Sequence, residues 1–281
     1  MTKSVMKYQE LYKWGCEQLA EVSITEANLD ARLLLEEVCK TDRNYLLIHG
    51  DEPVTEEQKE SYVNYISRRK KHEPLQQITG YQEFMGLQFV VTPDVLIPRQ
   101  DTETLVEEAM RYLHDGMHIL DMCTGSGCIL LSLLKYSNDC IGVGCDISKE
   151  ALTVAKENAD KLGITAEFIQ SNLFENVKDK YEIIVSNPPY IPSDVIPTLM
   201  EEVRDYEPKG ALDGFEDGLY FYREIIKSAK NHLYSGGMLF FEIGCEQAEA
   251  VSGYMKEAGY REVTVCKDLA GLDRVVYGTL F

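Results

Sequence analysis

Short apolar runs alternate with amphipathic stretches from residue 101 onward, and this alternation constrains the fold more than any other feature of the chain. We predict strands at residues 118–122, 141–146, 166–170, 181–186, 238–243, 262–266 and 275–279. Helices fit between them, including 102–113 and 149–162. Ser148 caps the second of these helices and Gly163 ends it. Such alternation is typical of a mostly parallel sheet with helices on both faces, so we predict an α/β fold.

Residues 1–73 show only helical periodicity. Apolar residues recur at helical spacing at Leu29, Leu33, Leu34 and Val38. Residues 55–58 form a capping box, and the helix that they open is expected to bury Tyr62, Val63 and Ile66. This helix ends in the basic run 68–71. The run could bind RNA or an acidic partner, but we interpret it as a solvated helix end that the helix dipole favours.

Two features divide the chain into parts. Pro74 interrupts the helical pattern, and residues 84–91 resemble a short hairpin that Pro93 and Pro98 separate from the α/β pattern. We therefore predict a small all-helical domain at 1–73, a linker with a hairpin at 74–98, and the α/β domain at 99–281.

Acidic residues outnumber basic ones by 47 to 28, which gives a formal net charge of −19. Residues 1–85 carry 11 Lys and Arg against 15 Asp and Glu, net −4. Residues 86–281 carry 17 against 32, net −15. The second part would repel a phosphate backbone unless it held a local basic groove, so we expect no direct binding of nucleic acid.

No apolar run is long enough to span a bilayer, and residues 1–10 hold no apolar signal-peptide core. We expect a cytoplasmic protein, monomeric and without a membrane partner. Two pairs among the eight cysteines have four intervening residues, Cys123 with Cys128 and Cys140 with Cys145. Four-thiolate metal sites usually have closer pairs, and the histidines show no metal-ligand spacing. We therefore expect reduced thiols and no metal.

The first chemical motif is the segment 121–127, DMCTGSG, where a strand turns into a helix. Gly125 and Gly127 let a ligand approach the backbone, and the helix start offers free N–H groups. Asp146 ends the next strand, 21 residues after Gly125, where an acid in a doubly wound sheet binds ribose hydroxyls. The loop and the acid together indicate an adenosine-containing cofactor. The alternative is a tight turn that binds no ligand.

The frame D-x-x-x-G-x-G lacks the third glycine of a dinucleotide fingerprint. It resembles the S-adenosylmethionine loop of Rossmann-like methyltransferases, which implies that cofactor and S-adenosylhomocysteine as product. Many such enzymes have glycine where this chain has Cys123, so we expect that residue 123 need not adopt a positive φ.

The second motif is Asn187-Pro188-Pro189-Tyr190, directly after the strand 181–186. It resembles the motif of methyltransferases that act on planar NH2 groups. The nitrogen of such a group is a poor nucleophile because its lone pair is delocalised. The Asn187 side-chain oxygen and the Pro188 carbonyl would accept its two hydrogens, stabilise developing positive charge and hold the nitrogen in line with the methyl group. Tyr190 would stack on the planar group.

The chain resembles the release factor glutamine methyltransferase family along nearly its whole length. The matching segments are 72–80, 97–103, 121–127, 186–190, 206–208 with 211–212, and 268–274. The resemblance implies methyl transfer from S-adenosylmethionine to the side-chain amide nitrogen of the glutamine in the Gly-Gly-Gln loop of peptide chain release factors. Relatives often have aspartate where this chain has Asn172, whose oxygen could still accept from the adenine amino group. A helical N-terminal domain, here 1–73, also fits the family and would recognise the protein substrate.

The predicted site residues come from these motifs. Those expected to bind the cofactor are Asp121, Cys123, Thr124, Gly125, Ser126, Gly127, Asp146, Ile147, Asn172, Leu173 and Asn187. The substrate would contact Asn187, Pro188, Pro189 and Tyr190, of which Asn187, Pro188 and Tyr190 would act in catalysis. Roles for Arg99 and Glu103 stay open.

Two other functions remain open. The chain could be an adenine-N6 methyltransferase acting on DNA or RNA, although its charge and its lack of a separate basic region speak against this. It could also be a non-catalytic binder of S-adenosylmethionine, but a pure binder has no need of the paired acceptors at Asn187 and Pro188.

Overall fold

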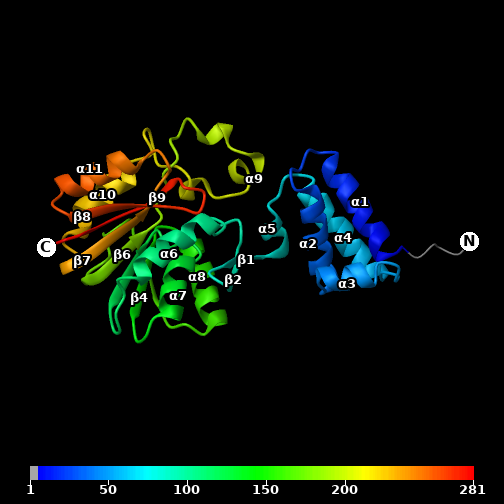
Figure 1. Ribbon diagram of the computed structural model, residues 1–281, viewed down its shortest axis with the longest axis horizontal. Coiled ribbons are helices and arrows are strands. Elements are labelled where there is room, and N and C mark those ends of the chain that lie inside the picture. Colours follow the sequence, from blue (N-terminus) through cyan, green and yellow to red (C-terminus); the bar gives the residue numbers. More distant parts are fainter. Residues whose placement is uncertain (1–5) are drawn as a thin grey trace, which may run out of the picture. The chain divides into compact units, whose positions relative to one another are not determined.

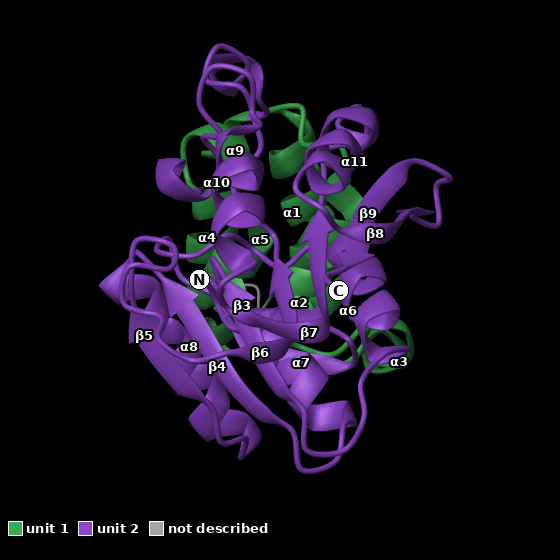
Figure 2. Ribbon diagram, turned by 90° about the vertical axis from the view of Figure 1, so that its left-hand side faces the viewer, with its two compact units in different colours: residues 1–80, 201–206 green, residues 81–200, 207–281 purple. Residues whose placement is uncertain are grey.

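The computed structural model of the chain describes residues 6–281 and separates into two compact units (Figure 2). The first unit ends at Gly80 and also includes Glu201–Tyr206, a short segment much later in the chain. The second unit comprises Tyr81–Met200 and Glu207–Phe281. The predicted hairpin therefore belongs to the second unit. No helix among the described residues is both long and apolar enough to cross a membrane.

The first unit is all-helical, as the sequence predicted (Figure 1). Its helices are α1 (Tyr8–Ala20), α2 (Ala27–Cys39), α3 (Arg43–Ile48), α4 (Glu56–Arg69), α5 (Leu75–Thr79) and α9 (Glu201–Arg204). Buried apolar side chains from α1, α2 and α4 form its core, among them Leu11, Leu34, Leu35, Tyr62 and Ile66. The Tyr62 hydroxyl donates to the carbonyl of Ala31 at 2.9 Å, which ties α4 to α2.

Two details of α4 differ from the prediction. The capping box is confirmed, with reciprocal bonds between Thr55 and Gln58, but Val63 is 36% exposed and faces away from the core. The end of the helix is not fully solvated, because Arg69 is only 7% exposed. Arg69 donates to Asp30 at 2.7 Å and pairs with Glu202 of α9 at 2.8 Å. Ion pairs that involve acids far along the chain leave no local signal, so the basic run looked like an exposed helix end.

The second unit is built on a seven-stranded sheet with the order β5-β4-β3-β6-β7-β9-β8. Its strands are β3 (His118–Met122), β4 (Ile141–Asp146), β5 (Glu167–Gln170), β6 (Tyr181–Ser186), β7 (Leu233–Glu242), β8 (Arg261–Lys267) and β9 (Asp273–Thr279). The pairs from β5 to β7 are parallel, and β9 is antiparallel to both β7 and β8. The mostly parallel sheet is confirmed. A separate hairpin consists of β1 (Tyr81–Phe84) and β2 (Leu87–Val90).

Helices cover both faces of this sheet (Figure 1). On one face α6 (Glu103–Met110), α7 (Cys128–Tyr136) and α8 (Lys149–Leu162) contribute to a core that includes Leu105, Leu130 and Ala159. On the other face α10 (Tyr220–Ala229) and α11 (Ala248–Glu257) contribute Ile225 and Val251 to a second core. Three single turns of 3-10 helix, η1 (Gln100–Thr102), η2 (Ile196–Thr198) and η3 (Lys209–Ala211), lie in the connections.

The strand order reverses at β3. This strand pairs with β4 on one side and with β6 on the other, all in the same direction. The connections after β3 and β6 therefore run to opposite sides, which leaves a crevice at the carboxyl ends of the strands where ligands of doubly wound sheets bind. Both motifs singled out from the sequence begin at this edge.

Candidate active site

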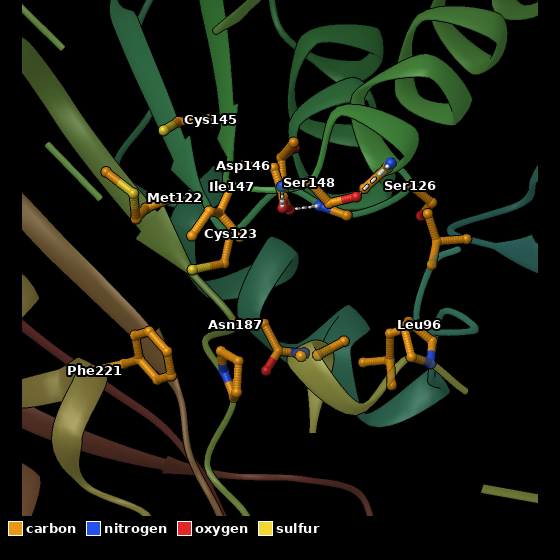
Figure 3. Close-up of a pocket in the computed structure, with 18 of the residues that line it drawn as sticks. Leu96, Met122, Cys123, Ser126, Cys145, Asp146, Ile147, Ser148, Asn187 and Phe221 are labelled. Carbon is orange, nitrogen blue, oxygen red and sulfur yellow. Dashed lines mark hydrogen bonds between the residues drawn. The ribbon is translucent and has the colours of Figure 1, made fainter. Parts of the chain in front are cut away.

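A cavity of about 320 Å³ lies at the carboxyl ends of the parallel strands (Figure 3). Its lining comes from the glycine loop after β3, the end of β4, the segment after β5 and the Asn187 loop after β6. Further lining residues come from two other parts of the second unit, residues 94–102 and 208–221. The lining is mainly apolar, and Asp146 and Asn187 place polar groups in it.

The glycine loop is held by Asp121, a fully buried residue of β3. One of its carboxylate oxygens accepts from the Thr124 hydroxyl at 2.6 Å and from the backbone N–H of Leu130 at 3.3 Å. Burial raises the pKa of Asp121 to about 7. Asp121 thus anchors the glycine loop through these two hydrogen bonds, and it is not part of the cavity lining.

Position 127 requires glycine for two reasons, its backbone conformation and the close packing of a neighbouring helix. Its φ is +80°, and a Cβ at this position would lie 3.3 Å from the Cβ of Ala155 in α8. Gly125, with φ of +55°, has open space where its Cβ would be, and it lines the cavity.

Asp146 joins the glycine loop to the next turn. One of its oxygens accepts from the N–H of Gly125 at 2.9 Å, and the other accepts from the N–H of Ser148 at 2.9 Å (Figure 3). Burial raises the pKa of this carboxyl, although the backbone donors at Ser148 and Gly125 oppose the shift. Because a carboxylate oxygen can accept more than one hydrogen bond, Asp146 retains acceptor capacity toward the cavity that it lines.

The expectation for Cys123 is wrong. Its φ is +65°, so the residue adopts the left-handed conformation that glycine would adopt without strain. Leu173 and Phe215 also line the cavity and have φ values of +48° and +68°. Left-handed backbone at such side chains costs about 1–3 kcal/mol each and is characteristic of functional sites.

Asn187 is half-buried and lines the cavity (Figure 3). The strand before it is anchored by Ser186, whose hydroxyl donates to the carbonyl of Met122 in β3 at 2.6 Å. The Asn187 side-chain nitrogen donates to the hydroxyl oxygen of Thr102 at 3.5 Å. With its nitrogen toward Thr102, the Asn187 side chain has its oxygen directed away from Thr102.

The rest of the Asn187 loop is supported by a turn at residues 213–218 and by Gln247. The Gln247 side-chain nitrogen donates to the carbonyls of Tyr190 and Gly218, at 3.0 and 3.2 Å. The N–H of Gly214 donates to the carbonyl of Ile191 at 2.8 Å. Gly218 packs so closely that a Cβ there would lie 2.3 Å from the Tyr190 carbonyl oxygen. The proline loop is therefore fixed from outside as well as by its own rings.

The structure brings together most of the residues that the sequence singled out. Those that line the cavity are Cys123, Thr124, Gly125, Ser126, Asp146, Ile147, Asn172, Leu173, Asn187 and Pro189. Asp121, Gly127, Pro188 and Tyr190 lie outside this lining. Tyr190 is half-buried against the core, and its hydroxyl donates to the Glu242 carboxylate at 3.4 Å. Its stacking on a substrate stays a prediction.

The sequence did not assign several lining residues to the site. They include Leu96, Thr102, Phe215, Tyr220 and Phe221. Thr102 lies in the segment 97–103 that carried part of the family resemblance, so a signal for it was present. Nothing in the sequence marked the three aromatic residues as part of the site, because apolar residues next to the start of a helix have the pattern of core residues. Within the described part of the chain, no cluster of three or more His, Cys, Asp or Glu could hold a metal ion, and the eight cysteines are free.

Known proteins resemble this chain along most of its length. Family models match at residues 10–80, described as PrmC N-terminal domain, and at residues 100–202, described as methyltransferase small domain. The release factor glutamine methyltransferase of Geobacter sulfurreducens is 42% identical over 273 residues, 97% of this chain and 96% of that protein. The enzyme of the same name from Clostridium acetobutylicum is 42% identical over 254 residues, 88% of this chain and 89% of that protein.

A solved methyltransferase from Pyrococcus furiosus shares the fold, with a TM-score of 0.53 and 16% identity over 69% of this chain and 89% of that one. The strand order, the glycine loop and the Asn187 loop thus define a Rossmann-like methyltransferase. More narrowly, the extent and level of identity show that the chain belongs to the release factor glutamine methyltransferase family.

The close packing at Gly218 makes a prediction about stability. Gly218→Ala would drive a Cβ into the Tyr190 carbonyl at a backbone angle that alanine rarely adopts. We expect the free energy of unfolding to fall by about 1–3 kcal/mol, measured by denaturant titration. Gly253→Ala is the matched control, because Gly253 lies within α11 with open space around it and should be neutral or slightly stabilising. Equal stability of both variants would contradict the proposed packing.

Proposed function

We propose that this chain transfers a methyl group from S-adenosylmethionine to the side-chain amide nitrogen of the glutamine in the Gly-Gly-Gln loop of peptide chain release factors. The observation that carries the proposal is the Asn187 side chain, held at the cavity by its nitrogen so that its oxygen is available as an acceptor. Family membership over nearly the whole chain supports the choice of substrate.

The residues of the cavity fit S-adenosylmethionine. Asp146 offers acceptors suited to ribose hydroxyls, and the open side of Gly125 admits a ligand close to the backbone. The Asn172 nitrogen donates to Glu175 at 2.9 Å, which leaves the Asn172 oxygen to accept from an adenine amino group. When bound, the cofactor would supply an electrophilic methyl group on a sulfonium.

The residues of the Asn187 loop would prepare the acceptor amide. The Asn187 oxygen and the Pro188 carbonyl would each accept one N–H, which orients the nitrogen and stabilises its developing positive charge. Methyl transfer would join the amide nitrogen to the methyl carbon as the carbon–sulfur bond breaks, with its electron pair left on sulfur. The nitrogen would lose one proton to water. The products are N-methylated glutamine and S-adenosylhomocysteine.

An adenine-N6 methyltransferase would use the same acceptors. The charge argues against it, since residues 86–281, which hold the cavity, carry a net −15. The first assay should therefore compare release factor, DNA and RNA as substrates. Incorporation of labelled methyl into nucleic acid rather than release factor would overturn the proposal.

Asp146 provides a test of cofactor binding. Asp146→Ala removes the predicted ribose acceptor and the tether to Gly125. Hydrogen bonds to charged groups contribute about 1.5–3 kcal/mol, so we expect affinity for S-adenosylmethionine to fall roughly 10-fold to 10²-fold, measured by calorimetry. Asp160→Ala, an exposed acid on α8, is the control for lost negative charge. Unchanged affinity in Asp146→Ala would remove this residue from the site.

Asn187 provides a test of the chemical step. Asn187→Ala deletes one acceptor and leaves the proline turn, so the single-turnover rate of release factor methylation should fall on the order of 10²–10³-fold. Cofactor affinity should fall much less. Asn187→Asp keeps an acceptor oxygen and should retain more activity than alanine. A wild-type rate in Asn187→Ala, or a loss explained entirely by weaker cofactor binding, would show the proposed role to be wrong.

We also propose that the first unit recognises the release factor. The match to the PrmC N-terminal domain at residues 10–80 and the helical composition of this unit support the assignment. A truncated chain that begins at Tyr81 should bind S-adenosylmethionine with little change but methylate release factor poorly. A thermal melt would verify that it is folded. Turnover equal to that of the full chain would contradict this role.

A further inference from the structure

Two aromatic side chains lie where the cavity opens to solvent. Phe215 and Tyr220 both line the cavity, and they are 50% and 40% exposed. Their rings meet edge to face with centroids 4.6 Å apart, and the Phe221 ring lies 5.6 Å from the first and 5.2 Å from the second. Phe221 packs against a core of the second unit, whereas Phe215 and Tyr220 leave much of their surface to solvent. We call Phe215 and Tyr220 the aromatic rim.

The aromatic rim lies at the end of the cavity that holds the Asn187 loop. Strands follow one another along this edge in the order β5-β4-β3-β6-β7, and the residues expected to bind the cofactor follow β3, β4 and β5. The turn that carries Phe215 is bonded to segments after β6 and β7 instead. The Phe215 carbonyl accepts from the N–H of Ser193 at 3.0 Å, and the Gln247 side chain donates to the Gly218 carbonyl at 3.2 Å.

Gly214, the residue before Phe215, packs directly on the proline loop. A Cβ at Gly214 would lie 2.8 Å from the Cα of Tyr190 and 2.9 Å from the carbonyl oxygen of Pro189. No side chain fits between these two backbones, so they stay in close contact. Phe215 is therefore one residue away from a direct contact with the loop that would hold the acceptor amide.

The conformation of Phe215 costs stability that a turn by itself does not require. Its φ of +68° lies in the left-handed region, which bulky side chains rarely adopt and which glycine adopts freely. Its N–H donates to the Asp213 carboxylate at 3.0 Å, which holds the residue in this conformation. Glycine at this position would close the same turn without strain and without an exposed ring. Costs of this kind are characteristic of functional sites.

We propose that Phe215 is a specificity-determining residue that contacts the release factor loop next to the acceptor glutamine. This inference rests on the proposed function and assigns a partner on the enzyme to the two glycines of the Gly-Gly-Gln loop. Because glycine has no Cβ, its backbone can lie flat against an aromatic ring. The exposed half of the Phe215 ring then becomes buried when the loop enters the cavity, which favours binding of this loop over loops with larger side chains.

Phe215→Gly and Phe215→Ala separate a substrate contact from a packing role. Both variants remove the ring, so both should raise the KM for release factor roughly 3-fold to 10-fold, the effect of losing about half the burial of a phenylalanine side chain. The kcat should change much less, because the contact binds substrate and transition state alike. Only glycine also relieves the left-handed backbone, so Phe215→Gly should melt at a higher temperature than Phe215→Ala and no lower than the wild type.

The experiment measures steady-state methylation of release factor by the full-length variants at saturating S-adenosylmethionine. Phe215→Leu keeps an apolar side chain and should restore most of the wild-type KM. Affinity for S-adenosylmethionine, measured by calorimetry, should stay within about threefold of the wild type in all three variants. Phe281→Ala is the control for loss of an exposed aromatic ring, since Phe281 is 66% exposed and lines no part of the cavity, and its KM should equal that of the wild type.

Three results would overturn the inference while the wild-type enzyme still methylates release factor. A wild-type KM in Phe215→Gly would show that the ring makes no contact with substrate. A lowered melting temperature in Phe215→Gly without a change in KM would assign the ring to packing against Tyr220 and Phe221. A loss of S-adenosylmethionine affinity as large as the loss in kcat/KM would assign Phe215 to the cofactor. Failure of the wild type to methylate release factor would overturn the proposed function and this inference together.

Discussion

Parallel pairing of β3 with both β4 and β6 is the constraint on which the second unit depends. The register sets Asp121 opposite Gly144 on one side and Val185 on the other, so the three strands finish at one edge of the sheet. Since the loops after these strands lead to opposite faces, the edge cannot be closed by backbone packing alone. The glycine loop, Asp146 and Asn187 meet there because strand direction places them there, although they are distant in sequence.

The carboxyl edge of this sheet is acidic as well as concave. Asp121 and Glu242 are buried near the ends of β3 and β7, and Asp146 ends β4. Burial raises the pKa of all three, to about 7 for Asp121 and Glu242. A bound cation would favour their ionised forms, whereas a phosphate would be repelled. Of these three acids, Asp146 lines the cavity, whereas Asp121 and Glu242 lie outside its lining.

Strained backbone around the cavity is supported by specific hydrogen bonds. The residue after Cys123 donates its N–H to the Cys145 carbonyl at 3.0 Å, and the Leu173 carbonyl accepts from the Ser171 hydroxyl at 2.7 Å. Phe215 donates its N–H to Asp213 at 3.0 Å and accepts from the N–H of Ser193 at 3.0 Å. These bonds are made by residues that mostly line the cavity, and they offset the cost of the left-handed conformations there. Backbone that is fixed by hydrogen bonds within the protein loses less conformational entropy when a ligand binds.

The sequence by itself determined the elements whose signals are local. The bounds of β3, β4, β6 and α8 agree with the prediction to the residue, because apolar runs, a Ser148 cap and a Gly163 terminator are all read within a few positions. It also determined the two motifs, and the matching segments dispersed along the chain indicated the family. Tertiary structure alone decided the burial of Arg69, the left-handed Cys123 and the contact of Asn187 with Thr102. Each depends on partners from other strands or helices, and the free energy of a buried charge or a strained backbone is set by those partners rather than by sequence neighbours.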